Sequence, residues 1–251
     1  MTHGQRTGTD PRVGRLPFPA GWVAGVAALA VLLPAVPPRA DDDPELEPAP
    51  FESEGDLAFF VDIARFVGPT PDRYDLEVYV AISNDQLVFE PEGSVVAGDL
   101  LLEIEMRDRE DEPVAALETP LAPQAASELD AGDRAIIQVI RERIQVPAGL
   151  HRMQVRVTDR RSQKVGLLNR MRNVKKKGEL DVWVEVQPIE RDRLAASDLA
   201  LVRSAQAADG VAAFGRNGVN FDPNPSRYYG LAVPSVRYYL EVYGGPGYQE
   251  G

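Results

Sequence analysis

The chain has 251 residues, of which 44% are hydrophobic and 26% charged, with a net charge of -12 at pH 7 and no cysteine. This composition is typical of one or two globular domains, and the absence of cysteine excludes disulfides, thiolate nucleophiles and thiolate-bound metal sites. The acidic balance argues against general nucleic-acid binding, because an acidic surface repels phosphate backbones.

Residues 1–40 have the organisation of a secretory signal peptide. Arg6, Arg12 and Arg15 precede an uncharged apolar run at 23–36, and Ala40 offers a small residue at which cleavage can occur. A membrane-spanning helix needs about 20 apolar residues, and this run is shorter, so an uncleaved anchor is the weaker alternative. The sequence therefore predicts an exported protein, periplasmic or secreted, that meets the membrane only transiently through this segment.

The segment 41–54 follows as a predicted tether. Residues 41–50 (DDDPELEPAP) hold five acidic residues and three prolines but a single leucine. A segment of this composition cannot bury enough apolar surface to fold, so we predict that it is disordered.

Between residues 55 and 190 the apolar side chains recur with a period of two, which predicts β-strands with one dry and one wet face. In 74–82 the aliphatic residues share one face, and Asp75, Glu77 and Tyr79 are expected on the solvent face. Strands are expected at 57–67, 74–82, 100–107, 114–119, 135–146, 150–158 and 180–186. Seven short strands joined by turns predict an all-β fold, an immunoglobulin-like antiparallel β-sandwich.

The connections between these strands favour the same fold. Segment 108–113 (DREDEP) is a charged turn, and 146–149 (VPAG) is a tight corner in which proline and glycine supply the required φ angles. In 135–146 the alternation loses its parity, because Ile137 and Ile144 fall on opposite faces. We expect a β-bulge there, or a strand that changes sheets.

After residue 190 the pattern changes. Segment 191–236 is expected to be a connecting region, in which 194–208 is either a helix capped by Ser197 or a short strand, and 210–230 is a loop. Residues 237–251 begin with another predicted strand (RYYLEVY). This strand either pairs with the preceding domain or opens a second module that the chain does not complete.

Five segments of the chain resemble the amino-terminal region of the bacterial GWxTD domain-containing proteins. They are 72–82 (DRYDLEVYVAI), 146–159 (VPAGLHRMQVRVTD), 197–199 (SDL), 221–229 (FDPNPSRYY) and 238–243 (YYLEVY). The resemblance implies an export signal, β-sandwich modules and a separate carboxy-terminal domain that carries the Gly-Trp-x-Thr-Asp signature. That signature is absent here, since Gly21-Trp22 is followed by Val23 and Ala24. The resemblance therefore implies a shortened member or a fragment, and it supplies architecture and location but no mechanism.

The most uneven feature of the sequence is a basic stretch at 160–177 (RRSQKVGLLNRMRNVKKK), which contains no acidic residue. Its basic residues are Arg160, Arg161, Lys164, Arg170, Arg172, Lys175, Lys176 and Lys177. They predict a positive lobe in an acidic protein. The lobe is either a solvated hairpin arm or a contact for anionic lipid headgroups, a cell-wall polymer or an acidic partner.

Other side chains suggest no catalytic site. Beyond residue 40 the one histidine is His151, which is expected at the rim of the core beside the 146–149 corner, in a structural role. Trp183 and Tyr79 have solvent-side parity, and an exposed aromatic pair can stack on a sugar ring. No cofactor or metal site is expected.

We therefore predict an exported, non-enzymatic β-sandwich module with a binding or structural role in the cell envelope. Its expected partner is an envelope protein, an anionic surface or a glycan, and not a nucleic acid. The alternatives are a carbohydrate-binding accessory module that uses Trp183, or the non-catalytic amino-terminal part of a larger GWxTD-type protein.

Overall fold

The computed structural model describes residues 44–163, 174–207, 215–230 and 234–245. The predicted signal peptide at 1–40 lies outside the described residues, as do Lys164, Arg170 and Arg172 of the basic stretch.

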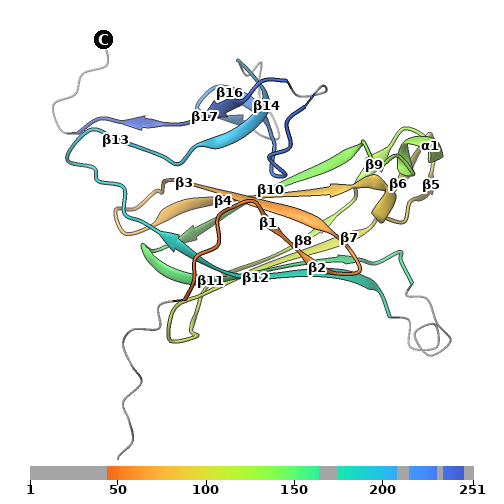
Figure 1. The fold of residues 1–251 in the computed structure, drawn as a ribbon, viewed down its shortest axis with the longest axis horizontal. Coiled ribbons are helices and arrows are strands. Elements are labelled where there is room, and N and C mark those ends of the chain that lie inside the picture. The colour runs from red at the N-terminus through yellow and green to blue at the C-terminus, as the bar shows by residue number, and fades with distance from the viewer. Residues whose placement is uncertain (1–43, 164–173, 208–214, 231–233, 246–251) are drawn as a thin grey trace, which may run out of the picture. The chain divides into compact units, whose positions relative to one another are not determined.

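Two antiparallel sheets form the body of the fold (Figure 1). The first sheet has the strand order β1 (Phe51–Glu52), β3 (Phe59–Val67), β4 (Tyr74–Ser83), β10 (Ile137–Val146). The second sheet has the order β2 (Glu54–Gly55), β12 (Lys176–Val186), β11 (Gly149–Asp159), β7 (Leu100–Arg107), β8 (Pro113–Leu121).

The order of these strands is that of an immunoglobulin-like sandwich. Counted along the chain, its long strands are β3, β4, β7, β8, β10, β11 and β12. The first, second and fifth of them lie in the first sheet, and the seventh, sixth, third and fourth are successive neighbours in the second. The fifth strand thus lies beside the second, and the sixth beside the third, as in Greek-key sandwiches. The predicted all-β, immunoglobulin-like sandwich is confirmed.

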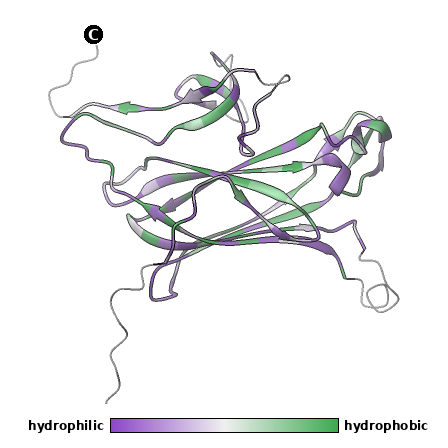
Figure 2. Cartoon of the chain, in the orientation of Figure 1, coloured by the Kyte–Doolittle hydropathy of each residue, from purple (hydrophilic) through white to green (hydrophobic). Residues whose placement is uncertain are grey.

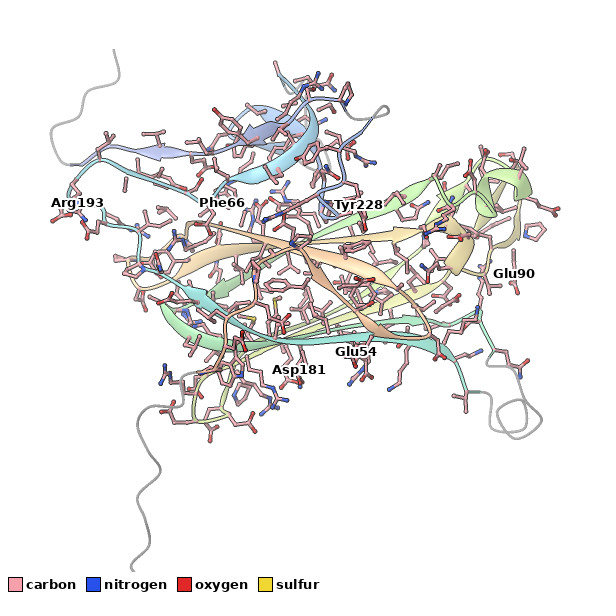
Figure 3. All side chains as sticks on the ribbon, viewed as in Figure 1. Glu54, Phe66, Glu90, Asp181, Arg193 and Tyr228 are labelled. Carbon is pink, nitrogen blue, oxygen red and sulfur yellow. The ribbon has the colours of Figure 1, made fainter. Side chains whose placement is uncertain are left out.

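The hydrophobic core lies between the two sheets. Strands β7, β11 and β12 alternate between buried and more exposed positions, as the period of two predicts. Figure 2 shows the alternation of hydropathy along the strands, and Figure 3 shows side chains filling the space between the sheets. The largest fully buried side chains include Phe59, Leu76, Leu102, Met106 and Met153. Burial of this apolar surface stabilises the sandwich without any disulfide.

Strand β4 departs from the predicted pattern, because it is buried on both faces. Its aliphatic residues face the core as expected, but the residues of the predicted solvent face are buried too. Asp75, Glu77 and Tyr79 are 8%, 0% and 2% exposed. The expectation of a wet face was wrong here because a third layer, built from the end of the chain, covers the first sheet.

This third layer is the C-terminal sheet, with the strand order β15 (Gly215–Arg216), β16 (Val219–Pro223), β14 (Ala200–Ala207), β17 (Arg237–Tyr239). A second hydrophobic cluster joins it to the first sheet: Phe66 and Tyr79 of the sandwich pack with Val202 and Phe221. Phe66 is drawn in Figure 3 between the two layers. The outer face of the first sheet is therefore an internal surface of the molecule.

The strands of the C-terminal sheet test the predictions for segments 194–208 and 210–230. The strand alternative for 194–208 is correct and the helix is wrong, since β13 (Ala195–Ala196) and β14 occupy that segment. The predicted loop at 210–230 contains the β15–β16 hairpin, whose turn uses Asn217 at φ 46 and Gly218 at φ 74. An Asn-Gly pair is the preferred sequence for such a turn, so the loop prediction was wrong at this point.

The predicted terminal strand is divided in two, and both parts pair with the preceding segment. β17 pairs with β14, and β18 (Val242–Tyr243) pairs with β13. The first of the two alternatives for this strand, pairing with what precedes it, is what the described residues show.

The prediction for 135–146, a bulge or a strand that changes sheets, is wrong as well. β10 pairs with β4 in an unbroken register from Ile137 opposite Ser83 to Val146 opposite Tyr74. Parity is lost because both faces of β10 contact protein, so apolar residues occur on each. Register shifts occur instead in β7, between Met106 and Arg107, and in β14.

The two predicted turns are present, whereas the predicted tether is shorter than expected. The charged turn joins β7 to β8, and the 146–149 corner joins β10 to β11, both as predicted. The tether at 41–54 is too long by its last residues, because β1 and β2 pair with β3 and β12. Phe51, only 4% exposed, fixes this segment to the core.

A small sheet lies at one end of the sandwich (Figure 1). Its strands are β5 (Glu90–Glu92), β6 (Val95–Ala97) and β9 (Gln124–Ala125). The short helix α1 (Glu128–Ala131), which Ser127 caps, contacts β9 of this sheet. The same helix contacts the 3-10 turn η1 (Asn84–Gln86). Arg134 lies in the loop that joins α1 to β10.

Candidate functional site

Three of the five described basic residues of the stretch, Arg160, Arg161 and Lys177, lie against carboxylates. Arg160 forms an ion pair with Asp99 at 2.7 Å, and Lys177 one with Glu179 at 2.5 Å. Arg161 lies 3.5 Å from a Glu90 oxygen and donates to the carbonyl oxygen of Ala97 at 2.6 Å; Lys175 and Lys176 are half-buried. The structure thus brings Arg160, Arg161 and Lys177 together with acidic residues, and Lys164, Arg170 and Arg172 lie outside the described residues.

The expected aromatic pair does not exist. Trp183 lies half-buried on the outer face of the second sheet, opposite Arg152 in register. Tyr79 lies in the first sheet and is buried under the C-terminal sheet. The two rings therefore belong to different surfaces, and no sugar can stack on both.

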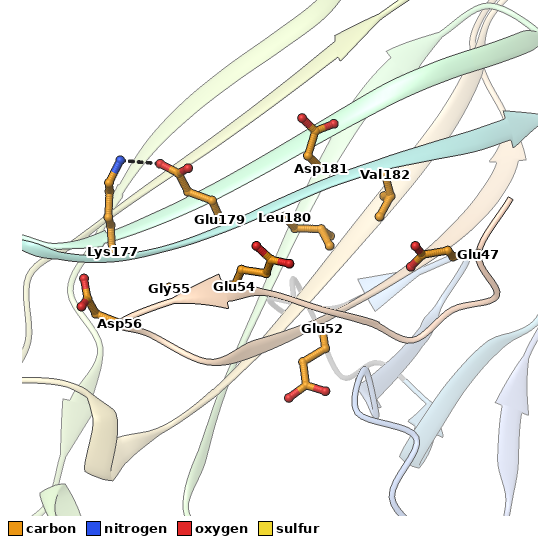
Figure 4. Close-up of a pocket in the computed structure, with 10 residues that line it drawn as sticks. All are labelled: Glu47, Glu52, Glu54, Gly55, Asp56, Lys177, Glu179, Leu180, Asp181 and Val182. Atoms are coloured by element: carbon orange, nitrogen blue, oxygen red, sulfur yellow. Dashed lines mark hydrogen bonds and ion pairs between the residues drawn. The ribbon is translucent and has the colours of Figure 1, made fainter. Parts of the chain in front are cut away.

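An acidic hollow of about 450 Å³ is lined by residues of the segment 47–56 and of β12. Figure 4 shows Glu54, Glu179 and Asp181 around it, with Lys177 bonded to Glu179. Asp181 is itself held by Arg152 at 2.5 Å. Within the described residues no group of three or more metal-ligating side chains could hold a metal ion.

His151 occupies the structural position that the sequence predicts. It is 2% exposed, and its Nε2 lies 3.0 Å from the carbonyl oxygen of Pro147 in the 146–149 corner. The ring therefore fastens this corner to β11.

A cleft of about 1020 Å³ lies between the first sheet and the C-terminal segments. We call it the central cleft. Its sandwich wall includes Phe60 of β3 and Ile137 of β10, and its other wall includes Arg203, Tyr228 and Arg237. Arg134, three serines and the amide of Gln86 also line it. Clefts between layers or domains are common ligand sites, because two elements contribute groups to one cavity.

Aromatic and cationic groups meet in this cleft. Tyr228 contacts Phe60 edge-on, with ring centroids 5.6 Å apart, and yet remains 69% exposed. Arg203 donates to Asp222 at 2.8 Å, but its Nε is buried without a hydrogen-bond partner in the described residues. Arg237 donates to the carbonyl oxygen of Arg203 at 2.7 Å.

The loop that carries Tyr228 is anchored by its neighbour, Arg227. This arginine adopts a left-handed φ of 53. Its guanidinium donates twice to Asp62 of β3, at 2.8 and 3.0 Å, and once to the carbonyl oxygen of Ala49 at 2.7 Å. A bidentate pair of this kind fixes orientation as well as distance, so the Tyr228 ring is held in place beside Phe60.

A buried charge network holds the C-terminal sheet on the sandwich beside the cleft. Its centre is Glu77 of β4, whose carboxylate accepts from Arg141 at 2.5 Å and Arg143 at 3.0 Å. Arg216 of the β15–β16 hairpin reaches the same carboxylate at 3.1 Å and also binds Glu241 at 2.5 Å. This network fixes the position of one wall of the cleft relative to the other.

The pKa values agree with a fully charged network. Burial alone would raise the pKa of Glu77, but the hydrogen bond from Tyr79 and the charges of Arg141 and Arg216 lower it below its ordinary value. The same balance of burial against Arg216 lowers the pKa of Glu241. Burial and the neighbouring Glu241 raise the pKa of Tyr239 to about 12. The carboxylates therefore stay ionised and the tyrosines stay protonated at neutral pH.

Sequence reasoning missed the central cleft and this network. A signal for the network was present, since Asp75 and Glu77 have the same two-residue spacing as Arg141 and Arg143, and Arg143 lies opposite Glu77 in register. The cleft has no such signal, because its residues come from several separate segments between Glu52 and Arg237.

Comparison with known proteins finds no matching family model, no similar curated protein and no similar solved structure. Among the described residues, no helix has the length and apolar character needed to cross a membrane.

Proposed function

We propose that this chain is an exported, non-enzymatic binding module of the cell envelope that holds a saccharide in the central cleft. The observation that carries the proposal is the cleft itself, a cavity of about 1020 Å³ with an exposed tyrosine ring at its mouth. Export is supported by the order of charged, apolar and small residues in 1–40.

The lining of the cleft supports a saccharide as the ligand. Tyr228 presents an aromatic ring that is fixed by its edge contact with Phe60 and by the anchor at Arg227. Serine hydroxyls and the amide of Gln86 line the same space and can exchange hydrogen bonds with sugar hydroxyls. A fixed aromatic surface combined with a few polar groups gives both contact area and orientation in small-ligand sites.

The environments of the buried Glu77 and His151 also favour a binding role over a catalytic one. The buried carboxylate Glu77 is held by three arginines, and the buried His151 contacts a backbone carbonyl. A general base needs to lie within hydrogen-bond reach of a substrate proton, and neither group lines the central cleft.

The test is a glycan array followed by calorimetric titration, with Tyr228→Ala compared with Trp183→Ala. Both changes remove one surface aromatic ring, so each controls for the other. We expect saccharide binding that Tyr228→Ala reduces at least tenfold and Trp183→Ala leaves intact. Loss in Trp183→Ala alone would place the ligand on the second sheet, and an array without any bound saccharide would contradict the proposal.

Export has its own test. The full chain is expressed in a bacterial host, and the periplasmic and cytosolic fractions are compared by immunoblot. We expect the protein in the periplasm, with an amino-terminus near residue 41 by mass spectrometry. Retention of the intact chain in the cytosol would contradict this part of the proposal.

A further inference from the structure

We infer that the central cleft selects a saccharide that carries a carboxylate, and that Arg134 and Arg237 recognise the carboxylate. This inference rests on the proposed saccharide-binding function and names its ligand class. The arginines of the cleft and those of the second sheet differ in how they are paired with carboxylates.

Three guanidinium groups line the cleft, those of Arg134, Arg203 and Arg237. Of these, only Arg203 has a carboxylate partner among the described residues, Asp222 at 2.8 Å. Arg237 is held through one backbone carbonyl, and Arg134 makes no hydrogen bond or ion pair in the described part of the chain. Both side chains are exposed and therefore open to a ligand.

Many other arginines of this acidic protein have a carboxylate partner, although Arg73 and Arg191, like Arg237, bind backbone carbonyls instead. On the second sheet, Arg152 is paired with Asp181 at 2.5 Å and Arg156 with Glu179 at 2.9 Å. In a chain with 39 acidic and 27 basic residues, carboxylate partners are abundant. Arg134 and Arg237 line one cleft and have no carboxylate partner among the described residues, which favours a ligand that carries negative charge.

The remaining lining restricts how much negative charge the ligand can carry. Glu52 and Asp222 line the same cleft, so a polyphosphate or a nucleic acid would meet like charges there. A single carboxylate suits the planar fork of a guanidinium, which binds it through two parallel hydrogen bonds. The uncharged remainder of the ligand then lies against Tyr228 and the serines. A sugar acid of the uronate type combines these properties.

The experiment compares an oligogalacturonate trisaccharide with a neutral galactose trisaccharide of the same linkage, titrated calorimetrically into the mature protein at low salt. We expect the uronate to bind at least tenfold more tightly. The double variant Arg134→Gln/Arg237→Gln should abolish this preference but keep weak binding of the neutral sugar. Arg160→Gln is the matched control, because it removes a surface arginine that does not line the cleft and is already paired with Asp99. This variant should keep the preference.

The outcomes separate the inference from the function on which it rests. Equal affinity for both sugars, or a preference that survives in the double variant, would overturn the carboxylate inference and leave the saccharide-binding function standing. Failure of both sugars to bind would count against the function and the inference together. Tight binding of an aspartate-rich peptide in the cleft, without uronate binding, would overturn the inference in favour of a protein partner. Thermal denaturation of each variant confirms that it is folded.

Discussion

The outer faces of the two sandwich sheets begin from the same sequence pattern and end in opposite environments. β4 and β12 both alternate aliphatic residues with Asp, Glu and one aromatic residue. On β12 the second set lies at the surface, whereas on β4 it is buried beneath the C-terminal sheet. Alternation therefore predicts a strand and its core face, but the fate of the other face depends on which distant segment packs there.

The same kind of charge pair has a different energetic role on the two faces. Arg152 and Asp181 on the second sheet are 40% and 43% exposed, and such surface pairs contribute about 0–1 kcal/mol. Arg141 and Glu77 on the first sheet are 7% and 0% exposed. Breaking a buried pair leaves an uncompensated charge and costs about 3–5 kcal/mol. The covered face should therefore be far more sensitive to substitution.

The largest effect is expected from Glu77→Ala. This change removes the shared acceptor of Arg141, Arg143 and Arg216 and leaves the buried charges of Arg141 and Arg216 without it. We expect the free energy of unfolding to fall by about 3–5 kcal/mol, measured by urea denaturation. Asp181→Ala on the second sheet is the control, with an expected change below about 1 kcal/mol. Equal effects of the two changes would contradict the contrast between the faces.

A somewhat smaller loss is expected from Phe221→Ala. Phe221 is 2% exposed, stacks on Tyr239 with centroids 4.8 Å apart, and belongs to the cluster that fixes the C-terminal sheet. Because the cluster is small and can partly relax, we expect a loss of about 3 kcal/mol, near the lower limit for aromatic truncation. Faster protease cleavage in the C-terminal strands should accompany it. Tyr238→Ala, at a 60% exposed position, should leave both measurements nearly unchanged.

The acid side of the stability curve should report the covered face. The pKa values of Glu77 and Glu241 are lowered in the folded state, from an ordinary value of 4.5. Their contribution is therefore complete above about pH 4.5 and is lost as the pH falls through the folded pKa values. We expect the urea midpoint to decrease on acidification, and less steeply in Glu77→Gln.

Other carboxyls act in the opposite sense, so the comparison with Glu77→Gln is needed. Burial raises the pKa values of Asp62 and Asp159, and these groups bind protons more readily in the folded than in the unfolded protein. They oppose acid destabilisation to the same extent in both proteins. Identical pH profiles for wild type and Glu77→Gln would show that Glu77 does not contribute.

The contrast between the faces also explains what the sequence could predict. The core faces of β7, β11 and β12 follow from local alternation, and the charged turn and the 146–149 corner follow from local turn chemistry. The burial of Glu77 and Tyr79 could not be predicted in this way, because Val202 and Phe221 cover them from more than 120 positions away. The parity loss in β10 has the same origin.

The central cleft was beyond prediction for a related reason. Tyr228 and Arg134 line the same cavity only because the C-terminal segments pack on the first sheet. Sequence reasoning instead selected the local concentration of charge at 160–177 and the exposed parity of Trp183. A high density of charged residues in one stretch of sequence predicts a charged surface. The central cleft is instead lined by residues that come from separate elements.

The smallest expected effect tests the exposed face. Arg152 donates through Nε and Nη2 to Asp181 at 2.7 and 2.5 Å, and both side chains are exposed to solvent. Because water and salt screen such a pair, Arg152→Ala should change the free energy of unfolding by about 0–1 kcal/mol. The difference should disappear in 1 M sodium chloride, where the Debye length is only about 3 Å. The effect of Glu77→Ala should persist in the same buffer, because salt ions do not enter the interface between the first sheet and the C-terminal sheet. If high salt weakened both effects equally, the network at Glu77 would have to be open to solvent.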